Sequence, residues 1–132
     1  MAAVDRPVVK ARPVYLNLVA IRQPLPAIVS ILHRISGAGL FVVGIPLVLW
    51  ALQASLMSPE GFAGLAAWFG QPVVKILTVL VAAGYFYHLF AGIRHLTMDV
   101  HVGLDLRSAR QSAALVLVVS IVIAIAIAVR LW

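Results

Sequence analysis

The amino-acid sequence predicts an all-α integral membrane protein with three transmembrane helices and a cytoplasmic N-terminus, and three observations support this prediction. Of the 132 residues, 64% are hydrophobic and only 11% are charged, with a mean hydropathy of +1.10. A soluble domain of this size cannot bury that much apolar surface, so most of it must face lipid. The chain also contains three long apolar runs, and its basic residues stand at the ends of those runs.

The predicted anchor domain, residues 29–132, follows an N-terminal arm of residues 1–28. We place its three spans at about residues 29–57, 72–97 and 111–132. The first span contains 23 consecutive residues without a charge, 35–57, or roughly 35 Å of helix, which is enough to cross a bilayer. Pro46 lies inside this run and predicts a kink, because proline cannot donate an intrahelical hydrogen bond. The segment Ser-Pro-Glu-Gly-Phe at 58–62 is typical of a helix start.

The second and third spans are bounded differently. The second is free of Lys, Arg, Asp and Glu between Lys75 and Arg94, and we interpret these two side chains as interface residues rather than buried charges. The third is interrupted only by Ser120 between residues 113 and 129. It has no polar stripe, which favours a lipid-facing or packing helix.

The distribution of basic residues predicts the topology. The N-terminal arm through Arg34 carries five Lys or Arg residues, the segment 94–111 carries three, and the other side carries only two. The positive-inside rule therefore places the N-terminus and the second loop in the cytoplasm. Although the net charge is +6, the cations lie at helix ends rather than in a patch with aromatics, so we expect no nucleic-acid partner. Cysteine is absent, which excludes iron–sulfur ligation and c-type haem attachment by this chain.

A histidine lies inside the second span, where an ionisable ring is costly and usually functional. On a helix, Gly84, His88, Gly92, His95 and Asp99 fall within an arc of roughly 80°. A glycine one turn before and one turn after His88 leaves a flat trough around the imidazole, which suits the face of a porphyrin. We therefore expect His88 to be an axial ligand of haem iron. The alternative is that it only hydrogen-bonds a neighbouring helix.

A second polar group stands at the start of the first span, where Ser30, His33, Arg34 and Gly37 share one helix face. This span begins at the surface where the second one ends, so His95 can approach the group. His33, Arg34 and His95 form a basic rim that can neutralise the two haem propionates. The Ser30 hydroxyl can donate to a quinone carbonyl, and the guanidinium of Arg34 can stabilise negative charge on the quinone oxygens. Arg34 by itself also fits the positive-inside rule.

The chain offers one good axial histidine, whereas a low-spin electron-transfer haem takes two axial ligands. A partner chain, or a second copy of this one, must therefore supply the other ligand. We expect the Asp99 carboxylate to pair with a histidine or arginine at the rim, or to cap the loop. His101 has no predicted role.

Four segments together resemble the cytochrome b subunit of bacterial succinate dehydrogenase, respiratory complex II. They are Arg12-Pro-Val-Tyr-Leu-Asn-Leu18, Ser30-Ile-Leu-His-Arg-Ile-Ser-Gly37, Ser58-Pro-Glu-Gly-Phe62 and His88-x-x-x-Gly-Ile-Arg-His95-x-x-x-Asp99. The resemblance runs from Arg12 to Arg110, and the third span matches only in hydropathy.

This resemblance implies a membrane anchor of a four-subunit enzyme in the bacterial inner membrane. A flavoprotein and an iron–sulfur subunit oxidise succinate and pass electrons to ubiquinone held at the anchor, and a haem b lies between this subunit and a second hydrophobic anchor subunit. By position, His88 resembles the axial ligand of this subunit, the other ligand coming from the partner. Ser30 and Arg34 look like the quinone-binding residues, and His33, Arg34 and His95 like the propionate contacts.

Three rival functions stay open at this point. The first is the anchor of a fumarate reductase, which runs the same chemistry backwards and which the sequence alone distinguishes poorly from a succinate dehydrogenase. A haem-free structural anchor would use the histidines only for packing. A small transporter with His88 as a proton relay is disfavoured, because the spans contain no buried carboxylate and no inverted repeat.

Overall fold

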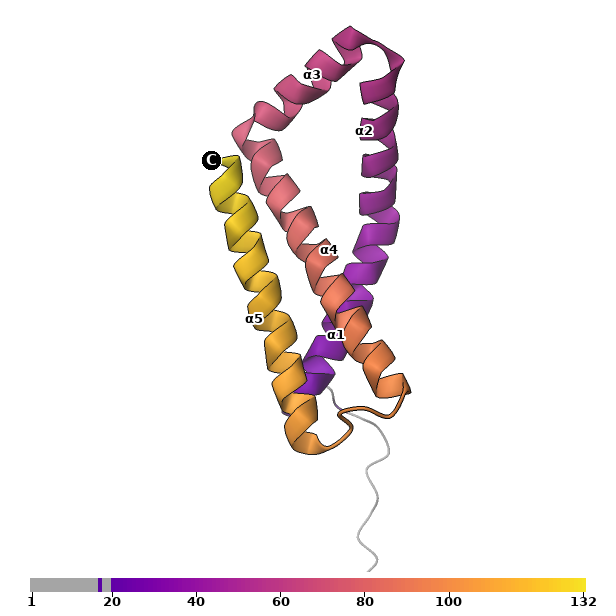
Figure 1. The fold of residues 1–132 in the computed structure, drawn as a ribbon, viewed down its shortest axis with the longest axis vertical. Coiled ribbons are helices and arrows are strands. Elements are labelled where there is room, and N and C mark those ends of the chain that lie inside the picture. The colour runs from indigo at the N-terminus through magenta and orange to yellow at the C-terminus, as the bar shows by residue number, and fades with distance from the viewer. Residues whose placement is uncertain (1–16, 18–19) are drawn as a thin grey trace, which may run out of the picture.

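The computed structural model describes Asn17 and residues 20–132, and the regular structure of these residues is helical throughout. In chain order the elements are α1 (Leu25–Gly39), the π-helical segment η1 (Leu40–Gly44), α2 (Ile45–Met57), α3 (Pro59–Gly70), α4 (Pro72–Asp99) and α5 (Leu106–Leu131) (Figure 1). Three stretches are long and apolar enough to cross a membrane: Leu25–Met57, Pro72–Asp99 and Leu106–Leu131. The predicted all-α fold with three spans is confirmed. Most of the arm, residues 1–28, lies outside the described residues, and the first helix begins at Leu25 rather than at residue 29.

The first span passes through Pro46 without a break in the helix. Pro46 has no N–H, and its ring crowds the carbonyl group of Val42, four residues earlier, so a regular α-helix is disfavoured there. The backbone widens into one π-turn over Leu40–Gly44, in which the N–H of Ile45 bonds to the carbonyl of Leu40. The ribbon changes direction where α1 passes into α2 (Figure 1). The expected kink is thus centred on the turn just before the proline.

The connection after the first span is a second short helix, α3. The Oγ atom of Ser58 accepts a hydrogen bond of 3.0 Å from the N–H of Gly61, and Pro59 occupies the first helical turn. The helix start predicted at 58–62 is therefore confirmed. A Cβ atom at Gly61 would lie 2.5 Å from the carbonyl oxygen of Ala54. Only glycine lets α3 begin this close to α2.

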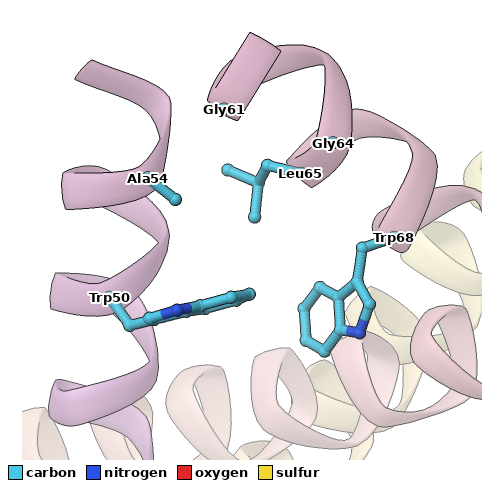
Figure 2. Close-up of a pocket in the computed structure, with 6 residues that line it drawn as sticks. All are labelled: Trp50, Ala54, Gly61, Gly64, Leu65 and Trp68. Atoms are coloured by element: carbon cyan, nitrogen blue, oxygen red, sulfur yellow. The ribbon is translucent and has the colours of Figure 1, made fainter. Parts of the chain in front are cut away.

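A cavity of about 340 Å³ lies between α2 and α3. Figure 2 shows the indole rings of Trp50 and Trp68 beside it, one from each helix, and their centroids are 5.1 Å apart in an edge-to-face arrangement. The remaining lining residues are Ala54, Gly61, Gly64 and Leu65. Tryptophan at the end of a membrane span is typical of the interfacial belt.

Small side chains form the core where α1, α4 and α5 meet. The buried cluster consists of Val29, Ala91, Ala113 and Val116. In lipid the hydrophobic effect does not drive helices together, so their association depends on close van der Waals packing. Small side chains allow this close approach. The hydroxyl of Tyr87 donates to the carbonyl oxygen of Val29 at 2.7 Å and ties α4 to α1. Many large apolar side chains outside this core are exposed, as a membrane or a partner subunit requires.

The two cations that bound the second span differ in burial. Lys75 is partly exposed and donates through Nζ to the carbonyl oxygen of Leu131 at 2.7 Å, at the end of α5. Arg94 is only 5% exposed. Its Nε donates to the hydroxyl of Ser112 at 3.0 Å, and one terminal nitrogen donates to the carbonyl oxygen of Ala109 at 3.3 Å. Arg94 is therefore a buried charge, contrary to the expectation, because its side chain turns onto α5.

Residues 100–105 connect α4 to α5 in a tight turn. His101 adopts a left-handed backbone conformation with φ 64°, and the N–H of Val102 reaches back to the carbonyl of Thr97 at 3.1 Å. This is the hydrogen bond of a Schellman helix end. The side chain of Asp105 then caps α5 by accepting from the N–H of Ser108 at 3.0 Å. Hydrogen bonds from the Ser108 side chain and backbone lower the pKa of the Asp105 carboxyl.

Candidate functional site

His88 lies within the second span and hydrogen-bonds to α1. Its Nδ1 atom is 3.0 Å from the backbone carbonyl oxygen of His33 and 3.2 Å from the hydroxyl of Ser36. A carbonyl oxygen can only accept, so Nδ1 is the donor in this arrangement, and in the neutral ring Nε2 then keeps its lone pair. The Ser36 hydroxyl is itself held by the same carbonyl at 2.9 Å. One ring nitrogen of His88 is thus fixed by α1, and the other is available as a ligand.

A glycine on α1 sets the distance between that helix and His88. A Cβ atom at Gly37 would lie 2.7 Å from Cε1 of His88, which no side chain could occupy without displacing the ring. The trough expected at Gly84 and Gly92 is found only in part. A Cβ atom at Gly84 would meet nothing within 4 Å, whereas one at Gly92 would lie 3.4 Å from Nε2 of His33. The imidazole of His33 therefore fills one side of the expected trough.

Three imidazoles cluster where α1 crosses α4. The ring of His33 stacks on that of His88, with centroids 4.1 Å apart and planes at 14°. It also lies 5.0 Å from the ring of His95, tilted by 40°. The structure thus brings His95 to His33, as the sequence predicts. Among the described residues, no group of three or more His, Cys, Asp or Glu side chains is arranged to hold a metal ion. A haem site does not require such a group, because most of the ligands of its iron belong to the porphyrin.

An apolar groove of about 350 Å³ opens beside His88, between α4 and the stretch from η1 into α2. Its lining residues are Leu40, Gly44, Ile45, Val48, Leu49, Val81, Tyr85 and His88. A porphyrin presents a flat apolar ring with a metal at its centre. An apolar wall with one available imidazole nitrogen therefore fits that group chemically.

The predicted quinone residues lie on the open side of α1. Arg34 is exposed and Ser30 is partly exposed, and they lie one helical turn apart, with His33 directly before Arg34 in the sequence. No described residue hydrogen-bonds to either side chain. Both polar groups can therefore reach a bound molecule or a partner subunit. Asp99 is also exposed, and its carboxylate neither pairs with an ion nor caps the turn within the described part of the chain. The expected role of Asp99 at the rim is not seen.

Two residues at the site are not predicted from the sequence. Ser36 touches Nδ1 of His88, and Tyr87 holds α4 against α1. Ser36 follows His33 by three residues, which puts both on one helix face, so helical periodicity could have indicated it. Nothing in the local sequence indicates the partner of Tyr87, because that contact joins residues 58 positions apart.

Comparison with known proteins gives a consistent result. A family model described as succinate dehydrogenase/fumarate reductase transmembrane subunit matches residues 9–127. The chain is 40% identical to the succinate dehydrogenase cytochrome b556 subunit of Paracoccus denitrificans over 118 residues, which cover 86% of this chain and 87% of that protein. The subunit of the same name in Coxiella burnetii is 37% identical over 122 residues, covering 92% and 97%. That of Rickettsia typhi is 29% identical over 123 residues, covering 93% and 95%.

Proposed function

Because the chain belongs to the family of succinate dehydrogenase and fumarate reductase transmembrane subunits, we propose that it is the haem b-binding membrane anchor of a succinate dehydrogenase. In this role it attaches a flavoprotein and an iron–sulfur subunit to the bacterial inner membrane. It also forms part of the site at which ubiquinone is reduced. The reaction thereby delivers electrons from succinate to the respiratory chain.

The geometry of His88 carries this proposal. Its Nδ1 is engaged by the carbonyl of His33 and the hydroxyl of Ser36, so Nε2 would be the atom that holds the haem iron. A hydrogen bond from the distal ring nitrogen fixes the tautomer and raises the basicity of a ligating histidine. When bound, the haem supplies a one-electron redox centre close to the quinone site. A second ligand for the iron would come from the other hydrophobic anchor subunit, since His88 is the one histidine among the described residues that line the groove.

Three cationic or hydrogen-bonding side chains of α1 and α4 are the proposed partners of the haem propionates. Arg34 is exposed, and His33 and His95 lie within one ring cluster. Haem propionates are anionic and need charged or strongly donating partners near the membrane surface. In the proposal, His33, Arg34 and His95 provide those partners.

Ubiquinone binds beside Ser30 and Arg34. The Ser30 hydroxyl donates to one quinone carbonyl oxygen and orients the ring. The guanidinium of Arg34 is cationic, so it stabilises the negative charge that develops on the quinone oxygens during reduction. Protons reach the site from the surface at which α1 begins and α4 ends. The distribution of Lys and Arg supports the assignment of this surface to the cytoplasmic side.

The experiment that tests this proposal is a haem assay on the intact purified complex. We expect one b-type haem per complex by pyridine haemochrome analysis, and succinate–ubiquinone reductase activity in the same preparation. An active complex without haem would instead favour the structural anchor, in which the three histidines only pack.

The family description also covers fumarate reductase, which is therefore the second candidate function. The two are distinguished by the preferred direction and quinone. A complex that reduces fumarate with menaquinol faster than it reduces ubiquinone with succinate would favour fumarate reductase.

A further inference from the structure

Arg94 is the one charged side chain that is buried among the described residues, with 5% of its surface exposed. Its hydrogen bonds go to the Ser112 hydroxyl and the Ala109 carbonyl, which are both neutral oxygens. No described carboxylate pairs with it. A buried guanidinium without a counter-ion is costly, so the site favours an anion from outside this chain.

Arg94 lines a groove of about 360 Å³ between α4 and α5. On α4 this groove lies about half a turn around the helix from His88, so it is separate from the histidine cluster. Its polar lining residues are Arg94, Thr97 and Ser112, and its apolar ones include Phe90, Val116 and Val119.

The polar residues line one end of the groove and the apolar residues line the other, which suits an amphiphilic ligand. Helix α4 ends and α5 begins at the same end of the molecule (Figure 1). Residues 94, 97 and 112 therefore lie toward that end, and residues 90, 116 and 119 lie deeper along the two spans. A ligand with an anionic head at the membrane surface and an apolar tail matches this order.

We propose that the groove binds an anionic phospholipid of the surrounding bilayer, with its phosphate at Arg94 and an acyl chain along Phe90, Val116 and Val119. Arginine is the side chain best suited to this contact, because its planar donors match phosphate oxygens. This inference concerns a different face of α4 from the proposed haem site and does not depend on it.

Native mass spectrometry of the intact complex, titrated with phosphatidylglycerol or with phosphatidylcholine of the same acyl chains, tests the proposal. We expect phosphatidylglycerol to be retained preferentially. Arg94→Gln should weaken its binding at least about tenfold, which corresponds to ~1.4 kcal/mol. Arg110→Gln is the matched control: it removes the same charge from an exposed position and should leave the preference in place. Equal retention of the two lipids by the unmodified complex would overturn the proposal.

A second variant is needed because Arg94 also holds α4 to α5, so Arg94→Gln could fail to assemble. Val119→Trp keeps Arg94 and its hydrogen bonds but fills the apolar half of the groove. It should displace phosphatidylglycerol while leaving the haem spectrum unchanged. Retention of the lipid by Val119→Trp, or a density map of the complex with a helix of a partner subunit in this groove, would show that no lipid binds there.

Discussion

The imidazole of His33 lies nearly flat against that of His88, with ring centroids 4.1 Å apart and planes at 14°. The backbone carbonyl of the same His33 accepts from Nδ1 of His88 at 3.0 Å. The backbone of His33 therefore orients the ring of His88, and the side chain of His33 covers one face of that ring. Because these contacts join α1 to α4, the proposed haem ligand is positioned by the packing of two spans rather than by either helix alone.

Arg34→Ala tests the quinone assignment. We expect succinate–ubiquinone reductase activity to fall on the order of 100-fold, because a donor that stabilises developing negative charge contributes about that factor. Succinate oxidation with a soluble dye should stay largely intact, since that reaction does not use the anchor site. Arg107→Ala, an exposed arginine at the start of α5, is the control and should leave both activities unchanged. If both activities fall together in Arg34→Ala, the substitution acts on assembly and the assignment loses its support.

Gly37→Ala tests the close approach of α1 to His88. The new Cβ atom would lie 2.7 Å from Cε1 of His88, so the ring has to move and haem retention should decrease. Gly39→Ala is a matched control on the same helix, where a Cβ atom would meet nothing within 4 Å. Both substitutions raise helix propensity by about 1 kcal/mol, so a difference between them reports the contact. Equal haem content in the two purified complexes would mean that Gly37 does not set the position of the ligand.

Ser36→Ala tests the second hydrogen-bonding partner of His88. Removing an acceptor from Nδ1 makes the imidazole a weaker electron donor to iron, which favours the reduced form. We expect the haem midpoint potential to rise by roughly 20–60 mV, the one-electron equivalent of about 0.5–1.5 kcal/mol. Redox titration of the complex measures this shift, and Ser36→Thr, which keeps a hydroxyl, should restore the original potential. A fall in potential for the alanine variant would contradict this role for Ser36.

The parts of the fold that depend on local chemistry could be predicted from the sequence. Hydropathy places the three spans, and the Ser58 cap with Pro59 places the start of α3. Helical periodicity also brings His33 and His95 to the same surface, and the structure has them 5.0 Å apart. These features need only the residues of one helix and the rule that consecutive spans alternate in direction.

The features that depend on how the helices cross could not be predicted in this way. Arg94 stands at the end of an apolar run, which in sequence looks like an interface position, but its side chain is directed onto α5 and is buried. The trough around His88 is shaped by a glycine of α1 and by the ring of His33, neither of which belongs to its own helix. The burial of Arg94 and the shape of this trough both depend on the crossing angle of the helices and on their rotation about their own axes. Periodicity within one helix does not predict either of these angles.

The central claim, that His88 ligates haem iron through Nε2, is tested most directly by the reduced-minus-oxidised absorption spectrum of the purified complex carrying His88→Ala. His95→Ala, at the outer edge of the same ring cluster, serves as the comparison. The account predicts that His88→Ala loses or shifts the low-spin haem bands, whereas His95→Ala keeps them. A haem spectrum unchanged in His88→Ala would contradict it.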